Sequence, residues 1–281
     1  MPDHAGLCML SIRHTTRYRY TEPLLYSVQT LHLWPSSGPC QRVVDWSIQV
    51  PGRLNELPAT QGNREHSFSL SARAPDGLME VVVVAQGKVE PTGVAEYDDT
   101  TGMPPAFYRR SSALAEPHPR LTAWARERLG ARATGSPTAS AALALAAAVA
   151  ERVRYRPGNT GVETTALEAF DWGLGVCQDQ AHVMVALCRG LGWPARYVSG
   201  YFFAQNEPEL ASHAWVDVCL DEASSRWLSV DVTHSCPTDQ RHVRLAAATD
   251  YAACLPIRGM RRGGGQESLD VRVQIEPVGL A

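Results

Sequence analysis

The stretch GVCQDQAHVMVALCRGLGWPARYVSGY, residues 175–201, decides the fold of this chain. Its apolar residues recur with helical spacing until Trp193-Pro194 interrupts them, and the run that follows is typical of a strand. With about 3.6 residues per turn, one helix face carries Cys177, Ala181, Met184, Cys188 and Leu191. That face is predicted to pack inward, which makes Cys188 a core thiol.

Cys177 differs from the other cysteines because it lies in the first turn of the predicted helix. Unpaired N–H groups and the helix dipole stabilise negative charge there, which favours the thiolate nucleophile and can hold an oxyanion. Gly173 and Gly175 allow a tight turn and leave room for a substrate carbonyl. The position suits acyl chemistry.

A thiol nucleophile needs a base, and the two nearest histidine candidates differ in geometry. His182 follows Cys177 by five residues, about 500° of helical rotation, so it points roughly 140° away and is excluded as the base. We expect His182 to be solvated or to cap the helix. His213 begins the strand-like run HAWVDVCL and can lie at the sheet end that faces the helix.

The base in turn needs a carboxylate to orient its ring. Asp217 shares a strand face with His213 but lies about 13 Å further along, which is too far. The next run, RWLSVDV, returns after a turn and brings Asp231 within roughly two residues of His213. We therefore predict that Cys177, His213 and Asp231 converge.

Two regions of different periodicity flank this segment. Short apolar alternations at 11–20, 27–34, 42–50, 66–72 and 78–89 predict an all-β, sandwich-like domain over residues 1–95. Residues 96–119 are rich in proline and glycine and are predicted to be a linker. Residues 120–281 then form the catalytic core.

The core is predicted to be α+β, with helices packed on an antiparallel sheet. One helix should span residues 121–130, and a second should open with Ser136 as N-cap and Pro137 at the first position, ending near Val153. Strands follow at 195–203, 213–220, 226–232 and 268–277.

Composition excludes several classes of protein. The 281 residues carry a net charge of −3 without a basic block, so we expect no nucleic-acid partner. Seven cysteines without a CxxC pair argue against a disulfide framework or a zinc site. The N-terminus lacks a secretory pattern, and the apolar run 139–150 is too short to cross a bilayer, so a cytoplasmic protein without membrane contact is expected.

No cofactor is predicted from the sequence. A calcium-binding loop pattern is absent, and the glycine run RRGGG, residues 261–265, lacks phosphate-loop spacing and is expected to be a flexible loop.

The motifs described above resemble those of the transglutaminase-like superfamily of papain-type thiol enzymes. The resemblance rests on Gly-x-Cys-x-Asp at residues 175–179, His-Ala-Trp at 213–215 and an aspartate on the following strand. Residues 12–35 and 62–70 resemble the β-rich N-terminal domain of a bacterial subgroup. The resemblance implies that Cys177 is the nucleophile, His213 the general base and acid, and Asp231 the orienting carboxylate. Relatives usually read Asp-Pro-Thr-Asn where this chain has Asp-Val-Thr-His, so His234 is a rival imidazole.

The expected reaction is two-step acyl transfer on an amide or peptide bond, with a protein, peptide or small amide as substrate. Hydrolysis and transamidation both remain open, and the lack of a cross-linking context favours a cysteine protease or amidase. The alternative is a catalytically silent binding or scaffold module. The sequence does not predict the oligomeric state.

Overall fold

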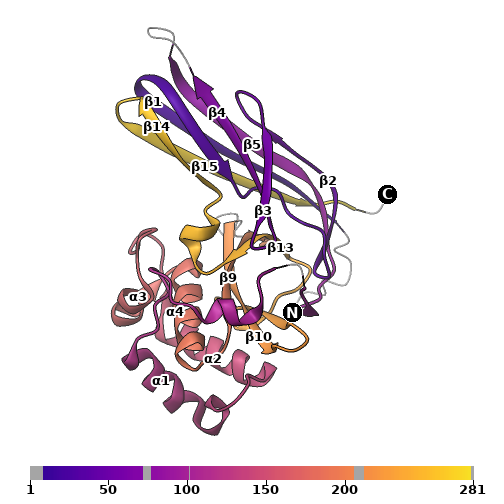
Figure 1. Ribbon diagram of the computed structural model, residues 1–281, viewed down its shortest axis with the longest axis vertical. Coiled ribbons are helices and arrows are strands. Elements are labelled where there is room, and N and C mark those ends of the chain that lie inside the picture. Colours follow the sequence, from indigo (N-terminus) through magenta and orange to yellow (C-terminus); the bar gives the residue numbers. More distant parts are fainter. Residues whose placement is uncertain (1–8, 72–76, 101, 206–211, 280–281) are drawn as a thin grey trace.

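The computed structural model describes residues 9–71, 77–100, 102–205 and 212–279. Three layers are stacked in it: a long N-terminal sheet, a second antiparallel sheet, and a group of helices on the far side of the second sheet (Figure 1). The predicted α+β class, with an all-β N-terminal region, is confirmed.

The N-terminal layer is a single seven-stranded sheet organised around one long strand. The first half of β1 lies between β5 and β15, and its second half lies between β4 and β14. Two expected strands, 11–20 and 27–34, are therefore one, because the register shift between Arg19 and Leu24 accommodates Pro23. The strands are β1 (Leu10–Leu31), β2 (Gln41–Gln49), β3 (Asn55–Thr60), β4 (Asn63–Ser71), β5 (Leu78–Pro91), β14 (Ile257–Gly263) and β15 (Glu267–Pro277).

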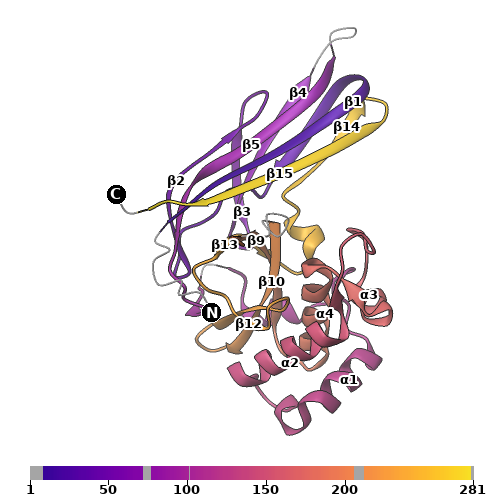
Figure 2. The same ribbon diagram turned by 180° about the vertical axis from the view of Figure 1, so that it is seen from behind.

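The C-terminal strands β14 and β15 differ from the sequence-based division, which assigned all of residues 120–281 to the core. Both pair with β1 in the N-terminal sheet, so the chain leaves this sheet, builds the core and returns (Figure 2). The glycine run at 261–265 is not a free loop. It ends β14 and forms the turn to β15, with Gly263, Gly264 and Gly265 all at positive φ.

The core sheet has six strands in the order β12-β11-β10-β9-β13, with β6 beside β11. Its strands are β6 (Glu96–Asp98), β9 (Ala195–Phe202), β10 (Ser212–Asp221), β11 (Arg226–Asp231), β12 (Cys236–Pro237) and β13 (His242–Ala248). The predicted linker thus contributes a strand, β6. A parallel pair, β7 (Arg154–Tyr155) and β8 (Leu174–Gly175), lies just before the helix that carries Cys177.

The helices cover one face of the core sheet and share its apolar cluster. They are α1 (Pro119–Leu129), α2 (Ala139–Arg152), α3 (Ala166–Trp172) and α4 (Cys177–Gly190), with short 3-10 turns at Pro105–Arg109, Gly130–Ala133 and Tyr251–Cys254. The helix predicted at 121–130 is confirmed. α2 begins later than expected because Thr138, rather than Ser136, caps it by accepting from Ala141 N–H.

The opposite face of the core sheet is covered by the N-terminal sheet. Tyr201, Val243 and Leu245 of β9 and β13 belong to the same apolar cluster as Leu10 and Ile12 of β1. Burial of these side chains between the sheets joins the two regions into one packed unit.

No helix in the described ranges is long and apolar enough to cross a membrane. Residues 1–8, on which the expected absence of a secretory signal partly rests, lie outside the described residues.

Candidate active site

Cys177 is the first residue of α4, as predicted, and is partly exposed. The first helical hydrogen bond runs from Gln180 N–H to the Val176 carbonyl at 3.0 Å, so the N–H groups of residues 177–179 precede the helical ladder. Such groups can stabilise an anion at the mouth of the helix.

Asp179 holds the turn that presents Cys177. Its Oδ2 accepts hydrogen bonds from Val176 N–H and from the Thr160 hydroxyl, each at 2.7 Å. Gly175 is required at this point because a Cβ there would lie 2.6 Å from the Asp179 Cβ. This packing explains in physical terms why glycine precedes the cysteine by two residues and aspartate follows it by two.

His213 lies on β10 with its ring buried, and its Nε2 donates to Asp231 Oδ2 at 2.9 Å. Burial lowers the pKa of His213, but the charge of Asp231, its hydrogen bond and the neighbouring Cys177 thiol outweigh burial and raise that pKa to about 10. The Nδ1 atom, although near the thiol, makes no hydrogen bond of ordinary geometry within the described chain. It is the ring nitrogen that the hydrogen bond to Asp231 leaves unoccupied.

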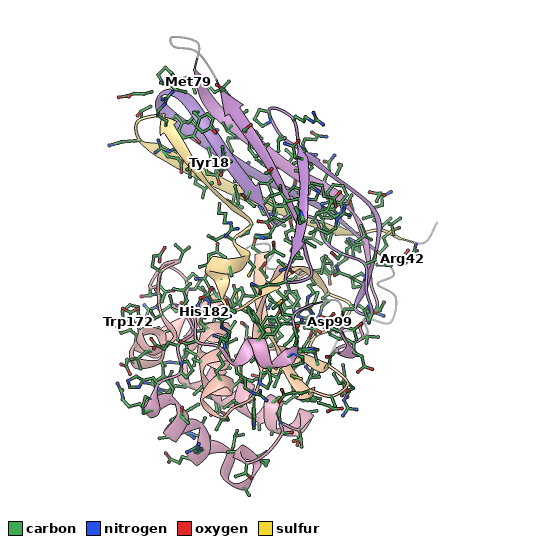
Figure 3. The ribbon with its side chains drawn as sticks, viewed as in Figure 1. Tyr18, Arg42, Met79, Asp99, Trp172 and His182 are labelled. Carbon is green, nitrogen blue, oxygen red and sulfur yellow. The ribbon has the colours of Figure 1, made fainter. Side chains whose placement is uncertain are left out.

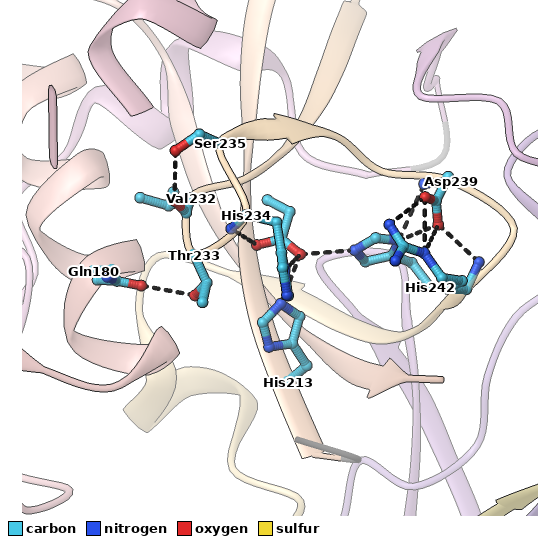
Figure 4. A network of polar contacts seen from close by, with 10 residues as sticks. Gln180, His213, Val232, Thr233, His234, Ser235, Asp239 and His242 are labelled. Atoms are coloured by element: carbon cyan, nitrogen blue, oxygen red, sulfur yellow. Dashed lines mark hydrogen bonds and ion pairs between the residues drawn. The ribbon is translucent and has the colours of Figure 1, made fainter. Parts of the chain in front are cut away.

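Asp231 ends β11 with its side chain fully buried, and three imidazoles meet at its Oδ2 (Figure 4). His213 and His242 each approach with Nε2 at 2.9 Å, and His234 approaches with Nδ1 at 2.7 Å. Burial raises the Asp231 pKa, but the His213 charge and these hydrogen bonds hold it well below its usual value. The carboxylate is therefore ionised at neutral pH.

His242 was not predicted from the sequence. It begins β13, and its Nδ1 lies 3.0 Å from Asp239 N, which donates to it, and 3.1 Å from Asp239 Oδ1. His242 is brought beside Asp231 by the pairing of β13 with β9. In the sequence itself, the spacing Asp-x-x-His at 239–242 is the local pattern that could have drawn attention to this histidine. His234 was named as a rival imidazole, and the structure places it on Asp231 rather than on the thiol.

Gln180 fixes α4 against the loop after Asp231. Its amide donates to the Val153 carbonyl at 2.8 Å and accepts from the Thr233 hydroxyl at 2.7 Å. The helix that carries the cysteine and the strand that carries the aspartate are thereby held in register.

The other two sequence candidates lie elsewhere. His182 is fully buried, not solvated, because α4 is enclosed on all sides; its Nε2 accepts from Tyr251 N–H at 3.2 Å and its ring packs on Tyr197. Asp217 is also buried, paired with Arg196 and Arg244. Neither contacts His213 through a hydrogen bond among the described residues. Cys188 is buried, as predicted.

The nitrogen and oxygen atoms of His213, Asp231 and His242 lie within 4.8 Å of one another, which is close enough for a shared metal ion. These atoms already satisfy one another through hydrogen bonds. The hydrogen bonds account for their convergence.

A cavity of about 450 Å³ opens beside Cys177 and His213. It lies between the core and the N-terminal sheet, with side chains of both in its walls. The partly exposed Cys177 thus borders this cavity, and His213 lies in the cavity wall with its ring buried.

Comparison with known protein families identifies two stretches of this sequence. The pattern of the transglutaminase-like superfamily matches residues 127–232, which contain Cys177, His213 and Asp231. The chain belongs to the transglutaminase-like superfamily. A second pattern, the bacterial transglutaminase-like N-terminal region, matches residues 10–90, the range of β1 to β5.

Relatives of this transglutaminase-like protein match either nearly its whole length or a part of it. An uncharacterised protein of Mycobacterium leprae is 28% identical over 95% of this chain and 98% of its own. A protein-glutamine gamma-glutamyltransferase of Pseudomonas aeruginosa is 30% identical, over 43% of this chain and 21% of its own. Among solved structures, a Cytophaga hutchinsonii protein provisionally assigned as a cysteine protease has a TM-score of 0.76 at 20% identity, covering 98% of this chain and 92% of its own. At that identity the likeness establishes the fold.

Proposed function

We propose that this transglutaminase-like protein is a thiol acyl-transfer enzyme that hydrolyses an amide or peptide bond through Cys177, His213 and Asp231. The observation that carries the proposal is the His213 ring, whose Nε2 is fixed by buried Asp231 at 2.9 Å while its Nδ1 is free on the side of Cys177. This is the relationship that nucleophile, base and orienting acid require.

The proposed reaction has two steps. The Cys177 sulfur attacks the carbonyl carbon, a C–S bond forms, and N–H groups at the start of α4 stabilise the oxyanion. The C–N bond then breaks, and the amine leaves with a proton from the His213 imidazolium. In the second step His213 removes a proton from water, the hydroxyl oxygen bonds to the acyl carbon, and the thiolate leaves.

Electrostatics supports this assignment of roles. The pKa of His213, raised to about 10, keeps the ring protonated at neutral pH, ready to donate to a leaving amine. Asp231 stays ionised and stabilises that cation, while His234 and His242 hold the carboxylate in place. An amine entering in place of water would give transamidation by the same steps.

The test is capture of the acyl-enzyme. Wild type and Cys177→Ala are incubated with cell lysate, and the mass of the adduct on Cys177 is read by mass spectrometry. The proposal expects an acyl adduct on wild type that decays in water and is absent from Cys177→Ala. Added methylamine distinguishes the two fates, because an enzyme that transamidates releases the acyl group as its N-methylamide and frees the Cys177 thiol, whereas a hydrolase releases the carboxylic acid.

The alternative, a catalytically silent binding module, predicts a different chemistry at Cys177. Iodoacetamide should then label Cys177 no faster than a free thiol, and His213→Ala should leave the rate unchanged. Rapid labelling that depends on His213 would exclude the silent module.

A further inference from the structure

The cavity beside Cys177 has two walls of different origin. One wall belongs to the core and includes Cys177, His213 and Tyr197. The other belongs to the N-terminal sheet, where Tyr18 of β1 lies next to the C-terminal strand β15 (Figure 3). The sheet that covers the core therefore also forms part of the space that a substrate must enter.

Strand register explains the chemistry of this second wall. Tyr18 is paired with Leu269, and Thr16 with Val271, and all four side chains line the cavity. The intervening pair, Arg17 with Asp270, alternates to the other face. The two-residue period thus places uncharged side chains toward the nucleophile and ionic ones away from it.

Leu269 and Val271 are apolar side chains left open in this wall, 58% and 47% exposed. No Asp, Glu, Lys or Arg is found among the cavity's described lining residues. His14, which also lines it, has its pKa lowered to about 4 by burial, so it is neutral at neutral pH. Among the described residues, the N-terminal wall therefore offers an apolar surface and no counter-ion, whereas the core wall carries the buried His213 imidazolium, which is already paired with Asp231.

We infer that the substrate is an amide whose group next to the scissile bond is uncharged and apolar, an aliphatic or aromatic side chain or acyl chain that packs against Leu269 and Val271. The inference rests on the proposed function, because the wall matters only if Cys177 attacks what the cavity holds. Removing such a group from water gives binding energy that a charged group would lose by desolvation.

The test uses four probes that alkylate a thiol with loss of chloride. They are unsubstituted chloroacetamide and its N-phenethyl, N-carboxyethyl and N-aminoethyl derivatives. The rate of Cys177 labelling in the full chain is measured by peptide mass spectrometry at neutral pH, and each rate is divided by the rate of the same probe with glutathione. We expect the phenethyl probe to exceed both charged probes by about tenfold or more.

Charged variants of the wall show where the preference arises. Leu269→Lys and Val271→Lys should raise the relative rate of the carboxyethyl probe, while Leu269→Glu and Val271→Glu should raise that of the aminoethyl probe. Met260→Lys is the matched control: Met260 is 70% exposed on β14 and lies outside the cavity lining. It should leave all four rates as in wild type.

The outcomes separate the two proposals. If unsubstituted chloroacetamide labels Cys177 slowly and independently of His213, the proposed function fails and the inference fails with it. If that labelling is fast and depends on His213, but the phenethyl probe has no advantage or the charge variants do not redirect the preference, the substrate inference alone is overturned.

Discussion

Burial lowers the pKa of His213, but Asp231 and the neighbouring Cys177 raise it on balance to about 10, so a cation lies beside the thiol at neutral pH. On the proposed function, this cation beside the sulfur activates Cys177 as a nucleophile. We therefore expect iodoacetamide to label Cys177 faster than it labels glutathione at the same pH. In His213→Ala the rate curve should move to higher pH, and in Asp231→Asn it should move part of the way.

The control for this pH profile is His118→Ala. This histidine belongs to a different element from the site residues: it caps α1, where it accepts a hydrogen bond from Arg120 N–H. It should reproduce the wild-type curve. A wild-type curve that His213→Ala leaves in place would show that another group activates the thiol.

His242 should act through Asp231 rather than on substrate. His242→Phe removes a donor from a buried carboxylate and leaves the Asp239 N–H without its acceptor, which should cost about 1–3 kcal/mol of unfolding free energy in urea. Cys177 labelling should also slow, because Asp231 can then rotate and release the His213 ring. His242→Gln keeps a hydrogen-bond donor and should recover part of the lost stability and part of the lost labelling rate. Equal effects of the Phe and Gln variants would contradict the role of His242 as a donor to Asp231.

At the residue scale, sequence reasoning reached the three residues whose positions follow from local rules. A helix start places Cys177, and a short return between two strands brings Asp231 within two residues of the position opposite His213. His242 could not be found this way, because its approach to Asp231 depends on β13 pairing with β9, a contact between segments about 40 residues apart in the chain. His182 was misjudged because helical rotation predicts its direction but not what covers it.

Among the elements, the turn before α4 is set by the packing of Gly175 on Asp179. Gly175→Ala would place a Cβ 2.6 Å from the Asp179 Cβ, so Asp179 must move and lose its bond to Val176 N–H. We expect a loss of about 1–3 kcal/mol in urea unfolding and slower labelling of Cys177.

Gly161→Ala is the matched substitution, since a Cβ at Gly161 would meet no atom within 4 Å. Its stability should stay within about 0.5 kcal/mol of wild type, with unchanged labelling. Similar losses in both variants would mean that glycine replacement in this region, rather than the Asp179 contact, explains the effect.

Elements with strong local signals were predictable, and those fixed by tertiary pairing were not. α4 and α1 followed from periodicity and their end signals. α3 was missed although Thr165 and Glu168 form a capping box at its start. The helix has only seven residues, which is too short to show a clear helical period. β6 was missed because three residues show no period, and it is ordered by pairing with β11.

For the whole molecule, the sequence indicated a β domain before a core but not that the chain's end returns to that domain. The alternation in residues 268–277 correctly predicted a strand, yet alternation does not say which sheet receives it. β15 pairs with β1 over eleven residues and so carries Leu269 and Val271 to the cavity. The cavity wall opposite Cys177 is thus built by β1 and β15, which are far apart in the sequence. For this reason the sequence alone did not indicate that this wall belongs to the site.

His14 makes the contact between the two sheets sensitive to acid. Its Nδ1 shares a 2.9 Å hydrogen bond with the Tyr201 hydroxyl across the interface, and burial lowers its pKa from 6.5 to about 4. The unfolded chain therefore binds this proton more readily than the folded protein does. The contribution of His14 to the free energy of unfolding is present in full above about pH 6.5. It decreases as the pH is lowered and reaches its minimum below about pH 4.

A lowering of about 2.5 pKa units corresponds to roughly 3 kcal/mol over that whole window, and about half of it should appear by pH 5.2. We expect urea unfolding of His14→Gln to lose less stability than wild type between pH 7 and 5, because glutamine does not titrate. His182→Gln supplies the comparison: His182 has the same lowered pKa of about 4 but lies within α4, away from the interface. Both variants should flatten the plot of unfolding free energy against pH. In wild type, protonation of His14 in the cavity lining should also weaken the preference of Cys177 for the apolar probe in acid. His14→Gln should keep that preference in acid, whereas His182→Gln should lose it as wild type does. A curve for His14→Gln parallel to that of wild type would show that His14 is not protonated on unfolding, and that acid acts on this protein elsewhere.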